Sequence, residues 1–278
     1  MNTEIIPIFN MKRIPTTFCW FTASLMALIS FTAQGGVILG SKHDLSSQTT
    51  NTTEVCVFCH TPHGADTGAS VPLWNKKLPA AGGYSRYSSL NTSSLDGEEA
   101  PVGSVSLACL SCHDGVQAMD VLINAPGSGG YDGAGAEFDL GAIGTMPGDG
   151  VALSAPIPNL GTDLQDDHPI SIQYAGGGCS DADGTGAGCG SLGDTDFKPP
   201  YSADINNVRI WWVDVAGVGV REKGDMQLYT RTDVDGTTVE PTVECGSCHD
   251  PHNQGSTPVD FLRVNNTNSD VCLACHIK

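Results

Sequence analysis

The chain has 278 residues, with 31 acidic and 13 basic side chains and a formal net charge of −18 at pH 7. Such an acidic surface repels phosphate backbones, which excludes nucleic acid as a partner. The 34 glycines, the 16 prolines and an aromatic content of only 6 % predict many turns and little regular secondary structure.

The first 35 residues have the pattern of a secretion signal. Lys12 and Arg13 precede an apolar run over residues 18–31, and small residues follow near Gly35, where we expect cleavage. This run is shorter than the roughly 20 residues that a membrane-spanning helix needs, although an uncleaved anchor is the alternative. The pattern predicts that the chain is secreted past the inner membrane, to the periplasm or the extracellular cell surface, without a stable membrane span.

Eight of the cysteines form four Cys-x-x-Cys-His motifs. In chain order the motifs contain Cys56, Cys59 and His60; Cys109, Cys112 and His113; Cys245, Cys248 and His249; and Cys272, Cys275 and His276. On one helical turn the two thiols and the imidazole share a face, so the thiols can attach one porphyrin edge while the histidine binds its iron. Zinc sites are the alternative, but zinc does not require a histidine after every cysteine pair. The motifs therefore predict four covalent c-type haems, with these histidines as proximal iron ligands.

Four further histidines match the four irons in number. They are His43, His63, His168 and His252. If each is a distal ligand, every haem has two imidazoles and no open position for a substrate, which predicts an electron-transfer protein and not an enzyme. The alternative distal ligands are Met119, Met146, Met226 and several lysines.

Two of the distal candidates stand three residues after a proximal histidine. These are His63, in Cys-His-Thr-Pro-His, and His252, in Cys-His-Asp-Pro-His. The proline stiffens the backbone, so the second imidazole points away from its own haem and is expected to bind a neighbouring one. The simplest assignment gives His63 to the second motif and His252 to the fourth. His43 and His168 then serve the other two irons, and the sequence does not determine which serves which.

The order of these features repeats along the chain. A leading histidine, a motif extended by Pro-His and a plain motif occur in residues 36–160 and again in residues 161–278. We therefore expect two dihaem halves within one unit. The expected fold is a multihaem cytochrome c, mostly irregular coil, whose core is the haems, with short helices at the haem motifs and few strands. One strand pair is expected at residues 208–215 and 226–230, where β-branched and aromatic residues gather.

Cys179 and Cys189 lack a following histidine and stand in a loop rich in glycine and aspartate. Outside the cytoplasm, such a pair is expected to form a disulfide. Between these cysteines, Asp181 and Asp183 resemble only the start of a calcium loop. The later ligands are missing, which favours an acidic turn.

The motifs together resemble tetrahaem cytochromes of the doubled Cys-x-x-Cys-His type from metal-reducing bacteria. The similar stretches are residues 40–46, 56–64, 72–75, 109–115, 167–171 and 261–263. These stretches are similar in particular to those of outer-surface tetrahaem cytochromes that polymerise into filaments (nanowires). In such filaments one subunit donates a histidine to a haem of the next. This resemblance implies electron transfer to other redox proteins or extracellular acceptors, and a homopolymer in which His43 or His168 is donated between subunits. A soluble periplasmic tetrahaem shuttle is the alternative function, and a multihaem reductase is a less favoured one.

Overall fold

The computed structural model describes residues 38–117, 119, 121–132, 159–180, 183–189, 191–232, 238–253 and 261–277. The predicted signal and Met146 lie outside these residues. Contacts group residues 36–278 into one unit. Within the described ranges, no helix is both long and apolar enough to cross a membrane.

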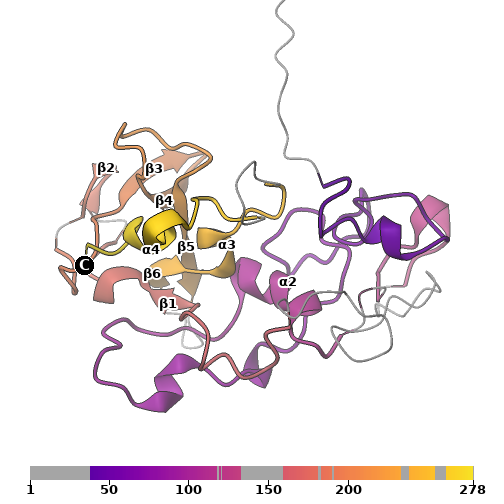
Figure 1. Cartoon of the computed structure of the whole chain (residues 1–278), viewed down its shortest axis with the longest axis horizontal. Coiled ribbons are helices and arrows are strands. Elements are labelled where there is room, and N and C mark those ends of the chain that lie inside the picture. Colours follow the sequence, from indigo (N-terminus) through magenta and orange to yellow (C-terminus); the bar gives the residue numbers. More distant parts are fainter. Residues whose placement is uncertain are drawn as a thin grey trace, which may run out of the picture. The chain divides into compact units, whose positions relative to one another are not determined.

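Six antiparallel strands form one sheet with the order β1-β6-β5-β4-β3-β2 (Figure 1). The strands are β1 (Ile172–Gln173), β2 (Gly186–Ala187), β3 (Tyr201–Ile205), β4 (Val208–Val213), β5 (Met226–Thr232) and β6 (Thr238–Val243). Strands β3 to β6 follow one another in the chain and in space. The hairpin between β3 and β4 turns on Asn206 and Asn207, whose φ angles of 51° and 62° suit a type I′ turn that matches the twist of the strands.

The predicted strand pair is confirmed as β4 and β5. Trp211 of β4 lies opposite Leu228 of β5, and Val213 lies opposite Met226. All four side chains are buried, so this pair forms the centre of the sheet's apolar face. Aromatic and β-branched side chains stabilise neighbouring strands through such cross-strand contacts.

In the described ranges, helices are few and short. The α-helices found there are α2 (Ser104–His113), α3 (Cys245–Cys248) and α4 (Asp270–Leu273). Single 3₁₀ turns are η1 (Leu45–Gln48), η2 (Ala81–Gly83), η3 (Tyr87–Leu90), η4 (Pro126–Ser128), η5 (Tyr174–Gly176) and η7 (Thr267–Ser269). The second motif ends α2, the third motif forms α3, and α4 carries the first cysteine of the fourth motif.

The fold class expected from composition is wrong. The chain is not mostly irregular coil, because the six-stranded sheet is its main element, and nothing in the structure shows a core made of haems. The reason is that the scarce large side chains are concentrated. One group, the sheet cluster, contains Tyr174, Ala175, Cys179, Trp211, Val213, Met226, Leu228 and Ala274. A second, the N-terminal cluster, contains Leu45, Val57, Phe58, Met119 and Leu122. A third contains Tyr84, Val102, Leu107, Leu110 and Leu164.

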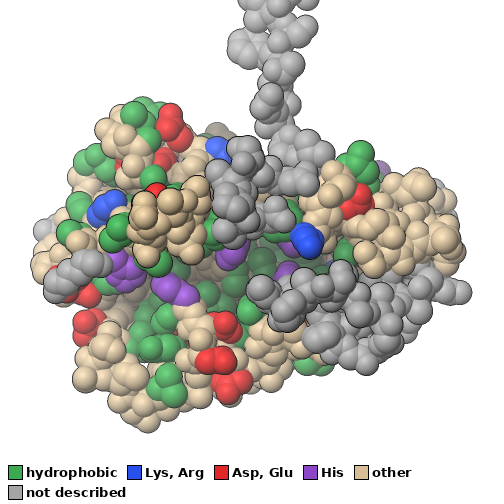
Figure 2. Space-filling view, in the orientation of Figure 1, with side chains coloured by type: hydrophobic (Ala, Val, Ile, Leu, Met, Phe, Trp, Pro, Cys, Tyr) green, Lys and Arg blue, Asp and Glu red, His purple; other side chains and the backbone are tan. Residues whose placement is uncertain are grey.

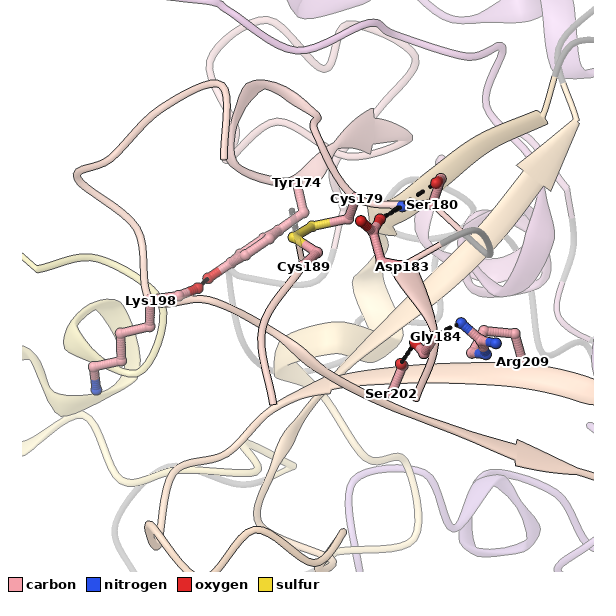
Figure 3. The surroundings of a disulfide bond; sticks show 9 residues. All are labelled: Tyr174, Cys179, Ser180, Asp183, Gly184, Cys189, Lys198, Ser202 and Arg209. Carbon is pink, nitrogen blue, oxygen red and sulfur yellow. Dashed lines mark hydrogen bonds between the residues drawn. A yellow bond between two sulfur atoms is a disulfide. The ribbon is translucent and has the colours of Figure 1, made fainter. Parts of the chain in front are cut away.

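The loop before β3 is closed by a disulfide between Cys179 and Cys189 (Figure 3), whose Cα atoms are 5.1 Å apart. At the base of this loop, the hydroxyl of Tyr174 donates a hydrogen bond of 2.8 Å to the carbonyl of Lys198. Gly178 has a φ of +92°, and a Cβ there would overlap the carbonyl of Ser191. The glycine is therefore required by both its backbone conformation and this close approach.

The acidic turn inside this loop is held by its own residues. The Asp183 carboxylate accepts a hydrogen bond of 2.7 Å from the backbone amide of Ser180. Asp181, the other residue of the faint calcium pattern, lies outside the described residues.

Candidate functional site

Each Cys-x-x-Cys-His motif folds as one helical turn. The second motif is the last turn of α2. In the other three, the histidine amide donates a hydrogen bond to the carbonyl of the first cysteine, with N···O distances of 2.8 Å at His60, 3.0 Å at His249 and 2.9 Å at His276. This turn places both thiols and the imidazole on one face of the backbone. All eight motif cysteines are free of disulfides, so the donor set has the chemistry and spacing that covalent haem attachment needs.

The four motifs are neighbours in series. The second cysteines of the first two motifs, Cys59 and Cys112, both pack against the N-terminal cluster. Those of the third and fourth motifs both pack against the sheet cluster. Between the two groups, the thiols of Cys109 and Cys245 are hydrogen bonded to each other. Each motif therefore adjoins the next along the chain.

Two motif thiols are buried deeply enough to shift their pKa values. Burial, together with the neighbouring Cys112, raises the pKa of Cys59 to about 12. Burial and the neighbouring Cys248 raise the pKa of Cys275 to about 12 as well. In the part of the chain that the structure describes, no group of three or more His, Cys, Asp or Glu side chains is arranged to hold a metal ion.

The third motif is anchored by a buried ion pair. Glu244 caps α3, and its fully buried carboxylate lies 2.5 Å from the Arg231 guanidinium. The Ser106 hydroxyl of α2 donates to the same carboxylate at 2.5 Å and accepts from the Cys245 amide at 2.9 Å. Burial raises the pKa of Glu244, and Arg231 opposes that shift. This network fixes the second motif against the third.

Lys76 is held beside the first motif. Its side chain is fully buried, and its ammonium donates hydrogen bonds of 3.1 Å to the carbonyls of Met119 and Val121. Met119 is itself a member of the N-terminal cluster, and Met226 is buried in the sheet cluster. Both methionines therefore pack in the core. This role is separate from that of distal haem ligand, for which they are alternatives to the histidines.

Several histidine rings are oriented through their Nδ1 atoms. His60 Nδ1 lies 2.8 Å from the Pro72 carbonyl oxygen, and His168 Nδ1 lies 3.0 Å from that of Pro169. His43 Nδ1 lies 3.4 Å from the carbonyl oxygen of Pro251. A metal-bound histidine commonly donates its second ring N–H to such a carbonyl. When Nδ1 of a neutral imidazole donates its proton to a carbonyl, Nε2 carries no proton and is the nitrogen that can bind an iron.

The candidate ligands come together as pairs from distant parts of the chain. The rings of His60 and His252 have centroids 6.1 Å apart and planes 15° apart. Those of His43 and His113 are also 6.1 Å apart, at 67°. On the face drawn in Figure 2, histidine side chains (purple) lie among hydrophobic ones (green).

For the other candidate haem ligands, proximity is shown by the effect of one imidazole on the pKa of another. Burial lowers the pKa of His276, and the nearby His168 lowers it further. Burial and the nearby His113 likewise lower the pKa of His249. His63 is exposed.

Four buried N–H donors have no acceptor within the described part of the chain, and one of them lies beside a haem motif. Among the described residues, the indole nitrogens of Trp74, Trp211 and Trp212 and the side-chain amide of Gln117 are buried without a partner. Buried indole N–H groups usually have an acceptor. Trp74 lies edge-on to His60 with ring centroids 6.1 Å apart. The propionates of a haem attached at the first motif would supply such acceptors, so the residues fit the cofactor.

Aromatic neighbours of the histidines were not predicted from the sequence. Phe261 stacks on His43 with centroids 4.1 Å apart, and Phe197 lies against His276 with centroids 4.3 Å apart. A single aromatic residue in a loop gives no periodic signal. Phe261 and Trp74 do fall within the stretches that carry the family resemblance, and that was the only signal for them.

Comparison with known proteins supports the haem interpretation for one region. Residues 240–278 match the family model of the doubled CXXCH motif. The match contains the third and fourth motifs and indicates covalent haem c binding. No curated protein matches the chain. The doubled motif is that of c-type cytochromes, so this region has the character of a cytochrome-like electron carrier.

Proposed function

We propose that the chain is an electron-transfer protein that carries four covalent c-type haems, each ligated by two histidines. The observation that supports this most is the serial contact of the four motifs, through the two clusters and the hydrogen bond between Cys109 and Cys245. Electron tunnelling falls steeply with distance, and haems attached to adjoining motifs lie close to one another. The chain then provides a continuous path from the first motif to the fourth.

Different residues of the chain have different roles in this electron transfer. The cysteines fix the porphyrin edges, and the histidines fill the axial positions, which leaves no site for a substrate. When bound, each haem supplies an iron that accepts and releases one electron. Two imidazole ligands hold its potential below that of a methionine-ligated haem. The apolar clusters pack against the second cysteine of each motif.

The proposed cellular site is outside the inner membrane. It rests on the signal pattern of the first 35 residues and on general knowledge that thioether haems are assembled outside the cytoplasm. Proposed partners are other redox proteins or extracellular acceptors. A filament with His43 or His168 donated between copies rests on the resemblance alone, and a soluble periplasmic shuttle is the alternative. Negative-stain microscopy of the secreted protein separates them, since a filament subunit forms fibres and a shuttle forms uniform particles of monomer mass.

The axial ligation is tested by spectroscopy of the purified protein. Optical and electron paramagnetic resonance spectra of the oxidised protein should contain low-spin haem only. A high-spin signal from one haem in four would contradict full bis-histidine ligation and would favour a reductase with an open iron. Turnover of nitrite or a similar oxyanion by that protein would support the reductase.

A further inference from the structure

The separation of His60 from His252 suits two ligands of a single iron. A metal–nitrogen bond of roughly 2 Å and a distance of roughly 1.1 Å from nitrogen to ring centre, counted on both sides, give centroids roughly 6 Å apart. The observed distance is 6.1 Å, with planes 15° apart. By contrast, Phe261 packs directly on His43 at 4.1 Å and 16°. The separation of His60 and His252 therefore matches that of two imidazoles on one iron and exceeds that of a direct ring stack.

The surroundings of His60 leave its Nε2 for the iron. Nδ1 of His60 is engaged by the Pro72 carbonyl at 2.8 Å. Nδ1 of His252 lies 3.7 Å from the Asp250 carboxylate. In His60 this contact leaves Nε2 as the ligating nitrogen, as is usual in metal sites, while the carboxylate beside His252 is too distant for a direct hydrogen bond.

A second pair has the same separation. His43 and His113 have ring centroids 6.1 Å apart. His43 is fixed from both sides by Phe261, which stacks on it, and by the Pro251 carbonyl. The planes differ by 67°, which axial ligation allows, since each imidazole can rotate about its own bond to the iron.

We propose that His252 is the distal ligand of the haem at the first motif, opposite His60, and that His43 is the distal ligand of the haem at the second motif, opposite His113. The proposal rests on the proposed function and departs from the simplest sequence assignment, which gave His252 to the fourth motif and His63 to the second.

This pairing has a consequence for the order of the haems. The His-Asp-Pro-His segment of the third motif supplies His252 to the first motif, and its Pro251 contacts the ligand of the second. The third motif thus ties the two halves of the chain together. By elimination, His168 serves the fourth motif, near His276, and His63 is left for the third. Because every distal ligand then comes from the same chain, this pairing favours the soluble shuttle over a filament that donates His43 or His168 between copies.

The test removes one haem and asks which histidine becomes dispensable. In a variant without the first motif (Cys56→Ala, Cys59→Ala and His60→Ala), denaturing mass spectrometry should count three covalent haems. Adding His252→Ala should leave all three low-spin in electron paramagnetic resonance. The matched control is His63→Ala in the same background, which removes the other histidine of the Pro-His type and should give one high-spin haem.

One high-spin haem after His252→Ala in that background would overturn the proposal, because His252 would then serve a remaining iron. If the three-haem protein does not fold, the four-haem double variant His60→Ala with His252→Ala gives the same answer. One altered haem supports a shared iron, and two altered haems exclude it. A wild-type protein that lacks covalent haem would refute the proposed function itself, which is a separate result.

Discussion

The ion pair between Arg231 and Glu244 should determine the stability of the region around the third motif. The Glu244 side chain has no exposed surface and that of Arg231 is 10 % exposed. Arg231 also donates to the Ser171 hydroxyl at 3.1 Å and to the Pro101 carbonyl at 2.6 Å. Arg231→Ala leaves the carboxylate buried with uncharged partners only, the Ser106 and Ser171 hydroxyls and the Ser247 amide. Removing one partner of a buried pair costs about 3 to 5 kcal/mol of unfolding free energy.

The loss should depend on pH in a defined direction. Burial raises the pKa of Glu244 above its usual value of 4.5, and removing Arg231 raises it further. A carboxyl with a raised folded-state pKa favours the folded state below its unfolded pKa, and this contribution is lost as pH rises through the folded pKa. The gap in stability between Arg231→Ala and the wild type should therefore narrow as pH falls from 7 toward 4.5.

The assay is thermal and denaturant unfolding of the haem-loaded protein at several pH values, followed by circular dichroism. At roughly 2 to 4 °C per kcal/mol, the midpoint should fall by roughly 10 °C at pH 7. The control is Lys223→Ala, whose side chain is 53 % exposed and lies 3.8 Å from the Asp250 carboxylate, and which should change the midpoint little. Equal midpoints for the two variants, or a gap that widens as pH falls, would refute the reasoning.

Three further changes test other parts of the fold, each by the shift of the unfolding midpoint. Lys76→Ala should cost about 2 to 4 kcal/mol, since two buried carbonyls lose their donor; a loss near zero would contradict this. Gly178→Ala should prevent stable folding of its loop, whereas Gly217→Ala, also at positive φ but with nothing within 4 Å of its Cβ, should cost far less. Replacing Cys179 and Cys189 by alanine should cost roughly 2 to 3 kcal/mol and leave the haem count unchanged; a lower haem count would show that the loop supports attachment.

The local features of the site could be predicted from the sequence because they depend on a few adjacent residues. A Cys-x-x-Cys-His motif folds into one turn largely independently of the rest of the chain. The strands β4 and β5 could also be predicted, since their aromatic and β-branched residues are contiguous. The disulfide partners were suggested by the absence of a histidine after Cys179 and Cys189.

The other strands of the sheet have no sequence pattern from which they could be predicted. Strand β6 contains Pro241, which argues against a strand, yet the residue is tolerated because the register between β5 and β6 shifts between Tyr229 and Arg231. Strands β1 and β2 have only two residues each. Their pairing depends on contacts distant in sequence, as does the approach of His252 to His60.

The number of covalent haems tests the central claim most directly. Denaturing mass spectrometry of the secreted protein reports the mass of the polypeptide with every thioether-bound haem retained. Four bound haems are predicted, one for each Cys-x-x-Cys-His motif. Two haems, confined to peptides from the matched region 240–278, or none, would contradict the account.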